Sequence, residues 1–134
     1  MHIPDKARLF SRLFSLMAPG GRLVITDYAR GKTPASPEFE RYIEKTGYSV
    51  IEPQQYGEVL EAAGFVNVVV DDATGKFVEI LRAEEGRLVS ERADFLATFS
   101  ESDLDYLVAR WNMKIGFCQA GDMKWGIYVA DKKA

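Results

Sequence analysis

Cysteine and histidine are almost absent from this chain of 134 residues, which contains one of each, Cys118 and His2. A single cysteine cannot form a disulfide within the chain, and one cysteine with one histidine is too few for a zinc cluster. The chain also lacks a signal peptide and any apolar run of eighteen or more residues. We therefore predict a metal-free, cytoplasmic protein with no membrane span.

The chain also lacks a large excess of positive or negative charge. Lys and Arg number 17, Asp and Glu number 20, and the net charge is -3, with both signs interspersed along the chain. Nucleic-acid binding needs a basic face, so we expect no nucleic-acid partner. The 134 residues are 47% hydrophobic, which is enough to bury the core of one globular domain.

Hydrophobic spacing predicts an alternation of helices and strands, and hence an α/β fold. Turn and capping residues set the helix limits: Ser36 and Pro37 begin one helix, Gly64 ends another, and "SESD" from Ser100 resembles a capping box. One long helix is expected to fray around Gly86. The predicted helices cover residues 4–17, 36–45, 56–63, 76–99 and 100–117, and the predicted strands lie at 23–28, at 65–70 and in "MKWGIYVADKK".

The stretch "PGGRLVITDY", residues 19–28, is typical of a strand with both faces buried, as in a parallel sheet, because a β-branched apolar run follows a sharp turn. Asp27 and Tyr28 come at its carboxyl end, the edge at which open α/β sheets bind ligands. They are the first candidates for a site. The alternative is that they only begin a loop.

Several segments together resemble phosphoethanolamine N-methyltransferases, most closely the second methyltransferase domain of the plant enzymes. The segments include "HIPDKARLF", "PGGRLVITDY", "SPEFERYIEKTGY", "FSESDLDYLVARW" and "KWGIYVADK", and the resemblance covers nearly the entire chain. The Pro-Gly-Gly turn occurs in many methyltransferases that use S-adenosylmethionine, whereas "SPEF" with its following tyrosines and "KWGIYVADK" are narrower signals.

The resemblance implies a Rossmann-like methyltransferase fold whose first half carries a glycine-rich loop for S-adenosylmethionine. No G-x-G triplet occurs among the eleven glycines of this chain. We therefore predict that residues 1–134 are a partial methyltransferase domain, the C-terminal half of the sheet with a helical insert that forms the substrate lid. The cofactor would be bound mainly by an N-terminal segment that these residues do not include.

The reaction implied by the resemblance requires a base, because an aminoethyl group with a pKa of roughly 10 must lose a proton before its nitrogen can accept a methyl group. His2 matches the histidine of the family's "H-I-x-D-K" motif, and an imidazole with a pKa of about 6.5 can accept that proton at neutral pH. In the family, this histidine is paired with a tyrosine from the N-terminal segment. Alternatively, His2 is a loose terminal residue.

The resemblance also implies which residues hold the phosphate of the substrate: Tyr28, Tyr42, Tyr48 and Lys114. Tyrosine hydroxyls and an ammonium suit a phosphate dianion. Core packing of Tyr42 and a solvated helix face for Lys114 are the alternatives. Thr46 occupies the place of a family arginine, and its presence removes a bidentate phosphate ligand.

Two functions follow as hypotheses. The first is S-adenosylmethionine-dependent N-methylation of phosphoethanolamine, or of its mono- and dimethyl forms, toward phosphocholine, with these residues as the C-terminal part of the enzyme. The second is a noncatalytic remnant or partner-binding module that keeps the lid fold. Methylation of another small amine, such as a glycine derivative, fits the tyrosine set less well.

Overall fold

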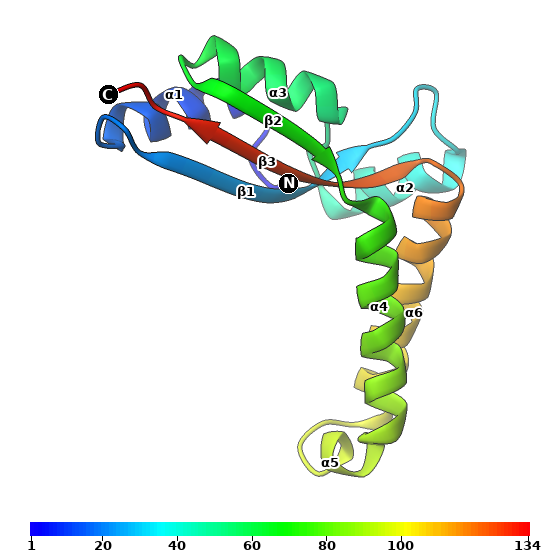
Figure 1. Ribbon diagram of the computed structural model, residues 1–134. Coiled ribbons are helices and arrows are strands. Elements are labelled where there is room, and N and C mark those ends of the chain that lie inside the picture. Colours follow the sequence, from blue (N-terminus) through cyan, green and yellow to red (C-terminus); the bar gives the residue numbers. More distant parts are fainter.

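The computed structural model describes all 134 residues, from Met1 to Ala134. Three strands form one sheet, two helices cover one of its faces, and a long helical hairpin projects from one end (Figure 1). The elements in chain order are α1 (Lys6–Leu16), β1 (Arg22–Arg30), α2 (Pro37–Thr46), α3 (Pro53–Ala62), β2 (Val66–Asp72), α4 (Thr74–Ser90), α5 (Arg92–Leu96), α6 (Glu101–Gln119) and β3 (Met123–Asp131). The predicted α/β class is confirmed.

Local capping signals define the helix starts as predicted. The Ser36 hydroxyl accepts a hydrogen bond from the Phe39 amide at the start of α2. At α6, Ser100 and Asp103 form a reciprocal capping box. Such caps supply partners for amides that the first turn of a helix leaves free. Gly47 ends α2 with φ 66°, a conformation that favours glycine.

The strands pair in the order β1-β3-β2, and both pairings are antiparallel. The prediction that the first strand is buried on both faces, as in a parallel sheet, is therefore wrong for these residues. β1 and β2 run in the same direction, but β3 lies between them and runs oppositely. Along β1, exposed residues alternate with half-buried ones from Arg22 to Asp27, the pattern of a sheet with one open face.

Two clusters of buried side chains divide the core. One lies between the sheet and the pair α1 and α3; the other lies at the root of the hairpin, where α2, α4 and α6 meet the ends of β1 and β3. The first cluster contains Phe10, Tyr56, Leu60, Phe65, Tyr128 and Ala130, and the second contains Tyr28, Phe39, Tyr42, Phe77, Leu81, Ile115, Cys118 and Met123. Full burial of one large apolar side chain contributes about 1.5–3 kcal/mol.

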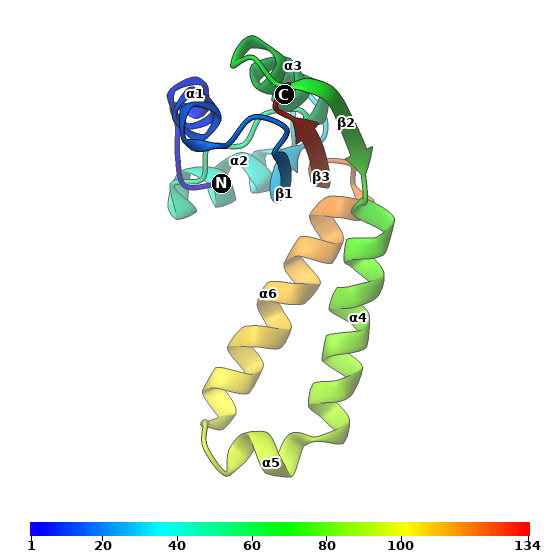
Figure 2. The same cartoon turned by 60° about the vertical axis from the view of Figure 1, so that its left-hand side comes forward.

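The hairpin runs from β2 to β3, with α4 and α6 extending together and α5 joining them at the tip (Figure 2). We predicted fraying around Gly86, but α4 continues through Gly86 and stops at Ser90. Arg87 pairs with Glu84 at 2.5 Å and with Glu91 at 3.3 Å. Ion pairs at this spacing stabilise a helix, which offsets part of the cost of a glycine in a helix interior.

No helix covers the other face of the sheet beyond the hairpin root. Val24, Val129 and Val69 form a row across the three strands on that face, and Val24 and Val69 are 60% and 55% exposed. Contiguous exposed apolar surface of this kind marks a contact surface. None of the helices has the length and apolar character needed to cross a membrane.

Candidate functional site

Three tyrosine rings meet at the root of the hairpin, and they come from three different segments. Tyr28 lies near the end of β1, Tyr42 on α2, and Tyr48 in the loop after α2. The Tyr48 ring lies 5.9 Å from the Tyr28 ring and 5.8 Å from the Tyr42 ring, between ring centroids. Tyr28 and Tyr42 are 8% and 7% exposed. The structure thus brings together three of the four residues predicted to hold phosphate.

Burial affects the pKa of two of these phenols. Removal from solvent is the main cause that raises the pKa of Tyr28 and of Tyr42 above the ordinary value. The Tyr42 hydroxyl is buried and makes no hydrogen bond within the protein. A neutral hydroxyl without a partner is free to donate to an anion, and a buried polar group without a partner is otherwise costly.

Lys114 and His2 each contact one ring of this tyrosine cluster. The Lys114 ammonium, from α6, is 5.2 Å from the centroid of the Tyr28 ring. The exposed His2 ring packs edge-on against Tyr48 at 5.0 Å. Burial, and secondarily the charge of Arg110, lower the pKa of Lys114. All five predicted site residues therefore lie in one continuous cluster.

Asp27 and Tyr28 are neighbours in β1 but serve different parts of the structure, because successive strand residues point to opposite faces. The Asp27 carboxylate accepts hydrogen bonds from the Met1 ammonium at 2.8 Å and from the Tyr56 hydroxyl at 3.3 Å. Asp27 thus contacts the segment that carries His2, while Tyr28 enters the tyrosine cluster. The alternative that both residues only begin a loop is wrong, since β1 continues to Arg30.

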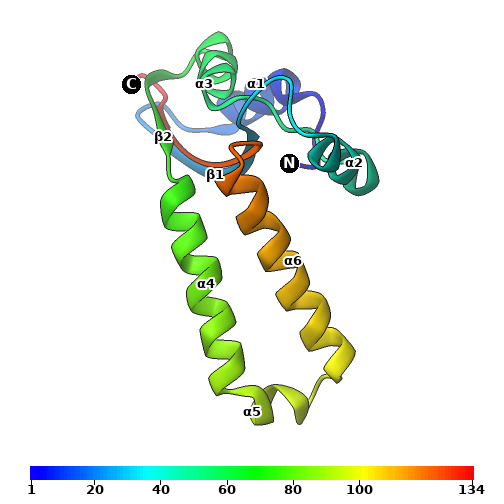
Figure 3. The same cartoon turned by 90° about the vertical axis from the view of Figure 1, so that its right-hand side faces the viewer.

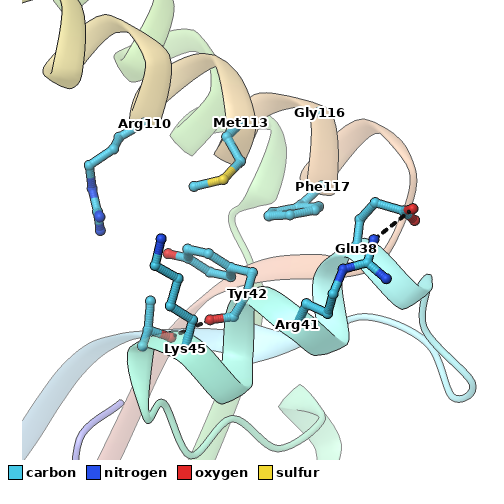
Figure 4. Close-up of a pocket in the computed structure, with 9 residues that line it drawn as sticks. Glu38, Arg41, Tyr42, Lys45, Arg110, Met113, Gly116 and Phe117 are labelled. Atoms are coloured by element: carbon cyan, nitrogen blue, oxygen red, sulfur yellow. Dashed lines mark hydrogen bonds and ion pairs between the residues drawn. The ribbon is translucent and has the colours of Figure 1, made fainter.

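An open groove of about 680 Å³ separates α2 from α6 beside the tyrosine cluster (Figure 4). Tyr42 and Thr46 are the predicted residues that line it. Figure 3 shows α2 next to the root of α6, where Phe39 and Tyr42 pack against Phe117. The groove is lined by Glu38, Arg41, Tyr42, Lys45, Thr46, Arg110, Met113, Gly116 and Phe117.

The basic residues of the groove were missed by the sequence interpretation. Glu38 is the only acidic residue in the lining, and it pairs with Arg41 at 3.1 Å. Lys45 and Arg110 form no ion pair. Thr46 turns its hydroxyl toward the main-chain oxygen of Tyr42, at 2.8 Å. Arg110 could have been identified from the sequence by its position four residues before Lys114, because that spacing places two residues on the same face of a helix.

The glycines of the chain form no cradle for a nucleotide cofactor. The glycines with positive φ are Gly20, Gly47, Gly64 and Gly121, and each lies between a helix and the segment that follows it. Dinucleotide and related cofactors are approached by a glycine turn that follows a strand. The described residues alone do not fit S-adenosylmethionine.

Comparison with known proteins identifies relatives that match almost the whole chain. The chain is 38% identical over 132 residues to phosphoethanolamine N-methyltransferase 1 of Arabidopsis thaliana, covering 98% of this chain and 27% of that protein. It is 31% identical over 133 residues to the phosphoethanolamine N-methyltransferase of Plasmodium falciparum (isolate 3D7), covering 98% of this chain and 50% of that protein. No protein-family model matches.

A solved structure gives the same relationship in three dimensions. Phosphoethanolamine N-methyltransferase 2 of Haemonchus contortus, in complex with phosphomonomethylethanolamine and S-adenosylhomocysteine, superposes with a TM-score of 0.93 at 32% identity. The match covers 99% of this chain and 31% of that one. A cyclopropane synthase of Mycobacterium tuberculosis, at 13% identity and a TM-score of 0.78, shares the fold. By sequence and by fold, residues 1–134 are a segment of the phosphoethanolamine N-methyltransferase family.

Proposed function

We propose that these residues form the substrate-binding part of an N-methyltransferase that acts on phosphoethanolamine or its mono- and dimethyl forms, toward phosphocholine. The observation that supports this most strongly is the convergence of Tyr28, Tyr42, Tyr48 and Lys114 on one cluster with His2 at its edge. A cluster of this composition contains hydroxyl and ammonium donors for a phosphate together with an imidazole that can act as a base.

The phosphate end is suited to a dianion. Tyr28 and Tyr42 are protonated at neutral pH, as tyrosines ordinarily are, and burial raises the pKa of each further, so both hydroxyls can donate. The Lys114 ammonium adds a positive charge that has no carboxylate partner. Charge-assisted hydrogen bonds to phosphate are shorter and stronger than neutral ones. In this proposal, the phosphate orients the aminoethyl arm toward Tyr48 and His2.

The amine end requires removal of a proton before methylation. An amine with a pKa of roughly 10 is protonated at neutral pH, and its nitrogen has no lone pair until the proton leaves. His2 is exposed and in contact with Tyr48, where it can take that proton, directly or through one water. S-adenosylmethionine would supply an activated methyl group at this point.

We place the cofactor site in a further segment of a longer enzyme, since the described residues do not fit it. The chain covers 27% of its Arabidopsis relative and 50% of its Plasmodium relative, so the rest of each relative has no counterpart here. The bare row of Val24, Val129 and Val69 supports burial of this face by such a segment. The hairpin would then act as a lid over the substrate. The cytoplasmic location stays a prediction.

The direct test is methyl transfer by a completed enzyme in which residues 1–134 follow the cofactor-binding segment of the Haemonchus relative. Phosphoethanolamine and S-adenosylmethionine should yield methylated phosphobase and S-adenosylhomocysteine, measured by mass spectrometry. Residues 1–134 alone should show no micromolar affinity for S-adenosylmethionine by calorimetry. Product formation from ethanolamine but not from phosphoethanolamine would contradict the proposed substrate. A folded, completed enzyme without any transfer would favour the noncatalytic alternative.

A further inference from the structure

Arg110 is a cation of the α2–α6 groove to which neither the sequence nor the proposed function assigns a role. It is half-buried, and Figure 4 shows its guanidinium reaching from α6 toward Lys45 and Tyr42 on α2. It lies one helical turn before Lys114, and neither residue forms an ion pair. Two like charges four residues apart destabilise an isolated helix, so a bound anion would stabilise this face of α6.

The surroundings of Arg110 hold the guanidinium in place without neutralising it. One Nη donates a hydrogen bond of 3.0 Å to the Tyr106 hydroxyl, and the guanidinium carbon lies 5.3 Å from the centroid of the Tyr106 ring. Stacking of this kind is a preferred arrangement for arginine. Because a guanidinium carries five N–H donors, most of them remain available to a ligand.

The charge of Arg110 acts on the tyrosine cluster. It is one of the groups that lower the pKa of Tyr28 and of Tyr42 against the larger effect of burial. Tyr42 is only 7% exposed, and its buried hydroxyl has no hydrogen-bond partner in the protein. A buried donor without a partner, in a groove lined by an unpaired guanidinium and next to the tyrosine cluster that the Lys114 ammonium contacts, is the composition of an anion site.

We propose that Arg110 binds the phosphate of the substrate together with Lys114 and the Tyr42 hydroxyl, and so determines specificity for phosphorylated amines. This inference rests on the proposed function. In this proposal, α6 supplies both cations and α2 supplies the Tyr42 hydroxyl. Thr46 on α2 carries no charge, and its own hydroxyl donates to main-chain oxygens of the same helix. The planar guanidinium can bind two phosphate oxygens at once, which an ammonium cannot do.

The position of Thr46 fits this assignment. Thr46 and Arg110 line the same groove from opposite helices, so a cation on either helix can reach an anion between them. The resemblance leads us to expect an arginine at position 46, and in this chain that position holds threonine. In this proposal, the guanidinium that binds the phosphate comes from α6 and not from position 46 on α2.

The test measures binding to residues 1–134 by calorimetry with three probes: phosphoethanolamine, inorganic phosphate and ethanolamine. Arg110→Ala should weaken binding of both phosphate-bearing probes by about 10- to 100-fold, as expected for loss of hydrogen bonds to a charged group. Arg110→Lys should recover part of that loss. The matched control is Arg87→Ala, which removes an arginine of α4 that lies outside the groove and is paired with Glu84 and Glu91, and it should cost less than 2-fold.

A second variant moves the cation rather than removing it. In the Arg110→Ala background, Thr46→Arg should restore phosphate binding, because the new guanidinium enters the same groove from α2. Circular dichroism and urea unfolding of every variant separate loss of binding from loss of fold. Restoration by Thr46→Arg would be difficult to explain if Arg110 only stabilised α6.

The outcomes separate this inference from the proposed function. Equal losses for Arg110→Ala and Arg87→Ala, with phosphoethanolamine still bound by the wild type, would overturn the role of Arg110 and leave the proposed function standing. Selective loss for Arg110→Ala with phosphoethanolamine bound no better than phosphate would support the anion site and count against the phosphobase. Absence of binding to any phosphate-bearing probe by the folded wild type would overturn the anion site.

Discussion

The ammonium of Lys6 donates a hydrogen bond of 2.5 Å to the main-chain oxygen of Ser49, which follows Tyr48 directly in the chain. The same ammonium donates to the main-chain oxygen of Ile3 at 3.2 Å. Lys6 is 5% exposed, an unusual position for a lysine. One buried charge thus joins the segment that carries His2 to the segment that carries Tyr48.

The first prediction concerns this link. Lys6→Met keeps the apolar stem but leaves two main-chain oxygens without their donor, so we expect a loss of about 1–3 kcal/mol in the free energy of unfolding. We also expect the His2 ring protons to lose the ring-current shift caused by Tyr48, measured by NMR. Lys76→Met is the control, because Lys76 is 72% exposed in its side chain. Unchanged His2 shifts in Lys6→Met would contradict a positioning role for Lys6.

A second prediction uses the two buried tyrosine hydroxyls without partners, those of Tyr42 and Tyr128. Replacement of either tyrosine by phenylalanine removes a costly unpaired group, so neither variant should lower the free energy of unfolding. Tyr42→Phe alone should weaken binding of phosphoethanolamine, by roughly 3- to 10-fold for one hydrogen bond of about 1 kcal/mol. Tyr128→Phe is the matched control, since Tyr128 belongs to the core cluster under α1 and α3. Equal binding by both variants would remove Tyr42 from the site.

The third prediction is a dependence of stability on pH. Burial raises the pKa of Cys118 from 9.0 to about 11. Between these values, the unfolded chain has lost the thiol proton and the folded chain still holds it, so the free energy of unfolding falls as the pH rises. Each unit corresponds to about 1.4 kcal/mol, so the full contribution is on the order of 2–3 kcal/mol.

Urea unfolding at pH 8 and pH 11 measures this contribution. The wild type should lose more stability across that range than Cys118→Ala, and the difference between the two isolates the thiol from the buried tyrosines, which are present in both. Parallel losses in the two proteins would show that Cys118 titrates alike in the folded and unfolded chains.

Several features of the fold could be predicted because they are local. The Ser36 cap, the Ser100 and Asp103 capping box and the end of α3 near Gly64 each depend on a few adjacent residues. The direction of strand pairing could not be predicted in this way. It depends on β3 inserting between β1 and β2, a contact between segments about 100 positions apart in the chain.

The candidate site likewise depends on contacts between distant segments, which local sequence patterns do not predict. Neither composition nor spacing could join Tyr28 to Lys114. The position of Tyr28 at the end of a predicted strand made it a candidate, but only the family resemblance selected Lys114. Arg110 was missed because an isolated arginine on an amphipathic helix is usually solvated. Its importance depends on the absence of a carboxylate partner and on the facing α2 helix, and both are properties of the folded chain.

Steady-state kinetics of the completed enzyme distinguish the proposed base, His2, from the proposed phosphate ligand, Lys114. A base matters when the proton moves, so His2→Ala should lower kcat by roughly 10²- to 10⁴-fold with little change in KM for phosphoethanolamine. A fixed ammonium attracts the phosphate in ground and transition states alike, so Lys114→Ala should mainly raise KM. Equal effects of both substitutions on kcat and KM, or an unchanged kcat for His2→Ala at pH 7, would contradict the account.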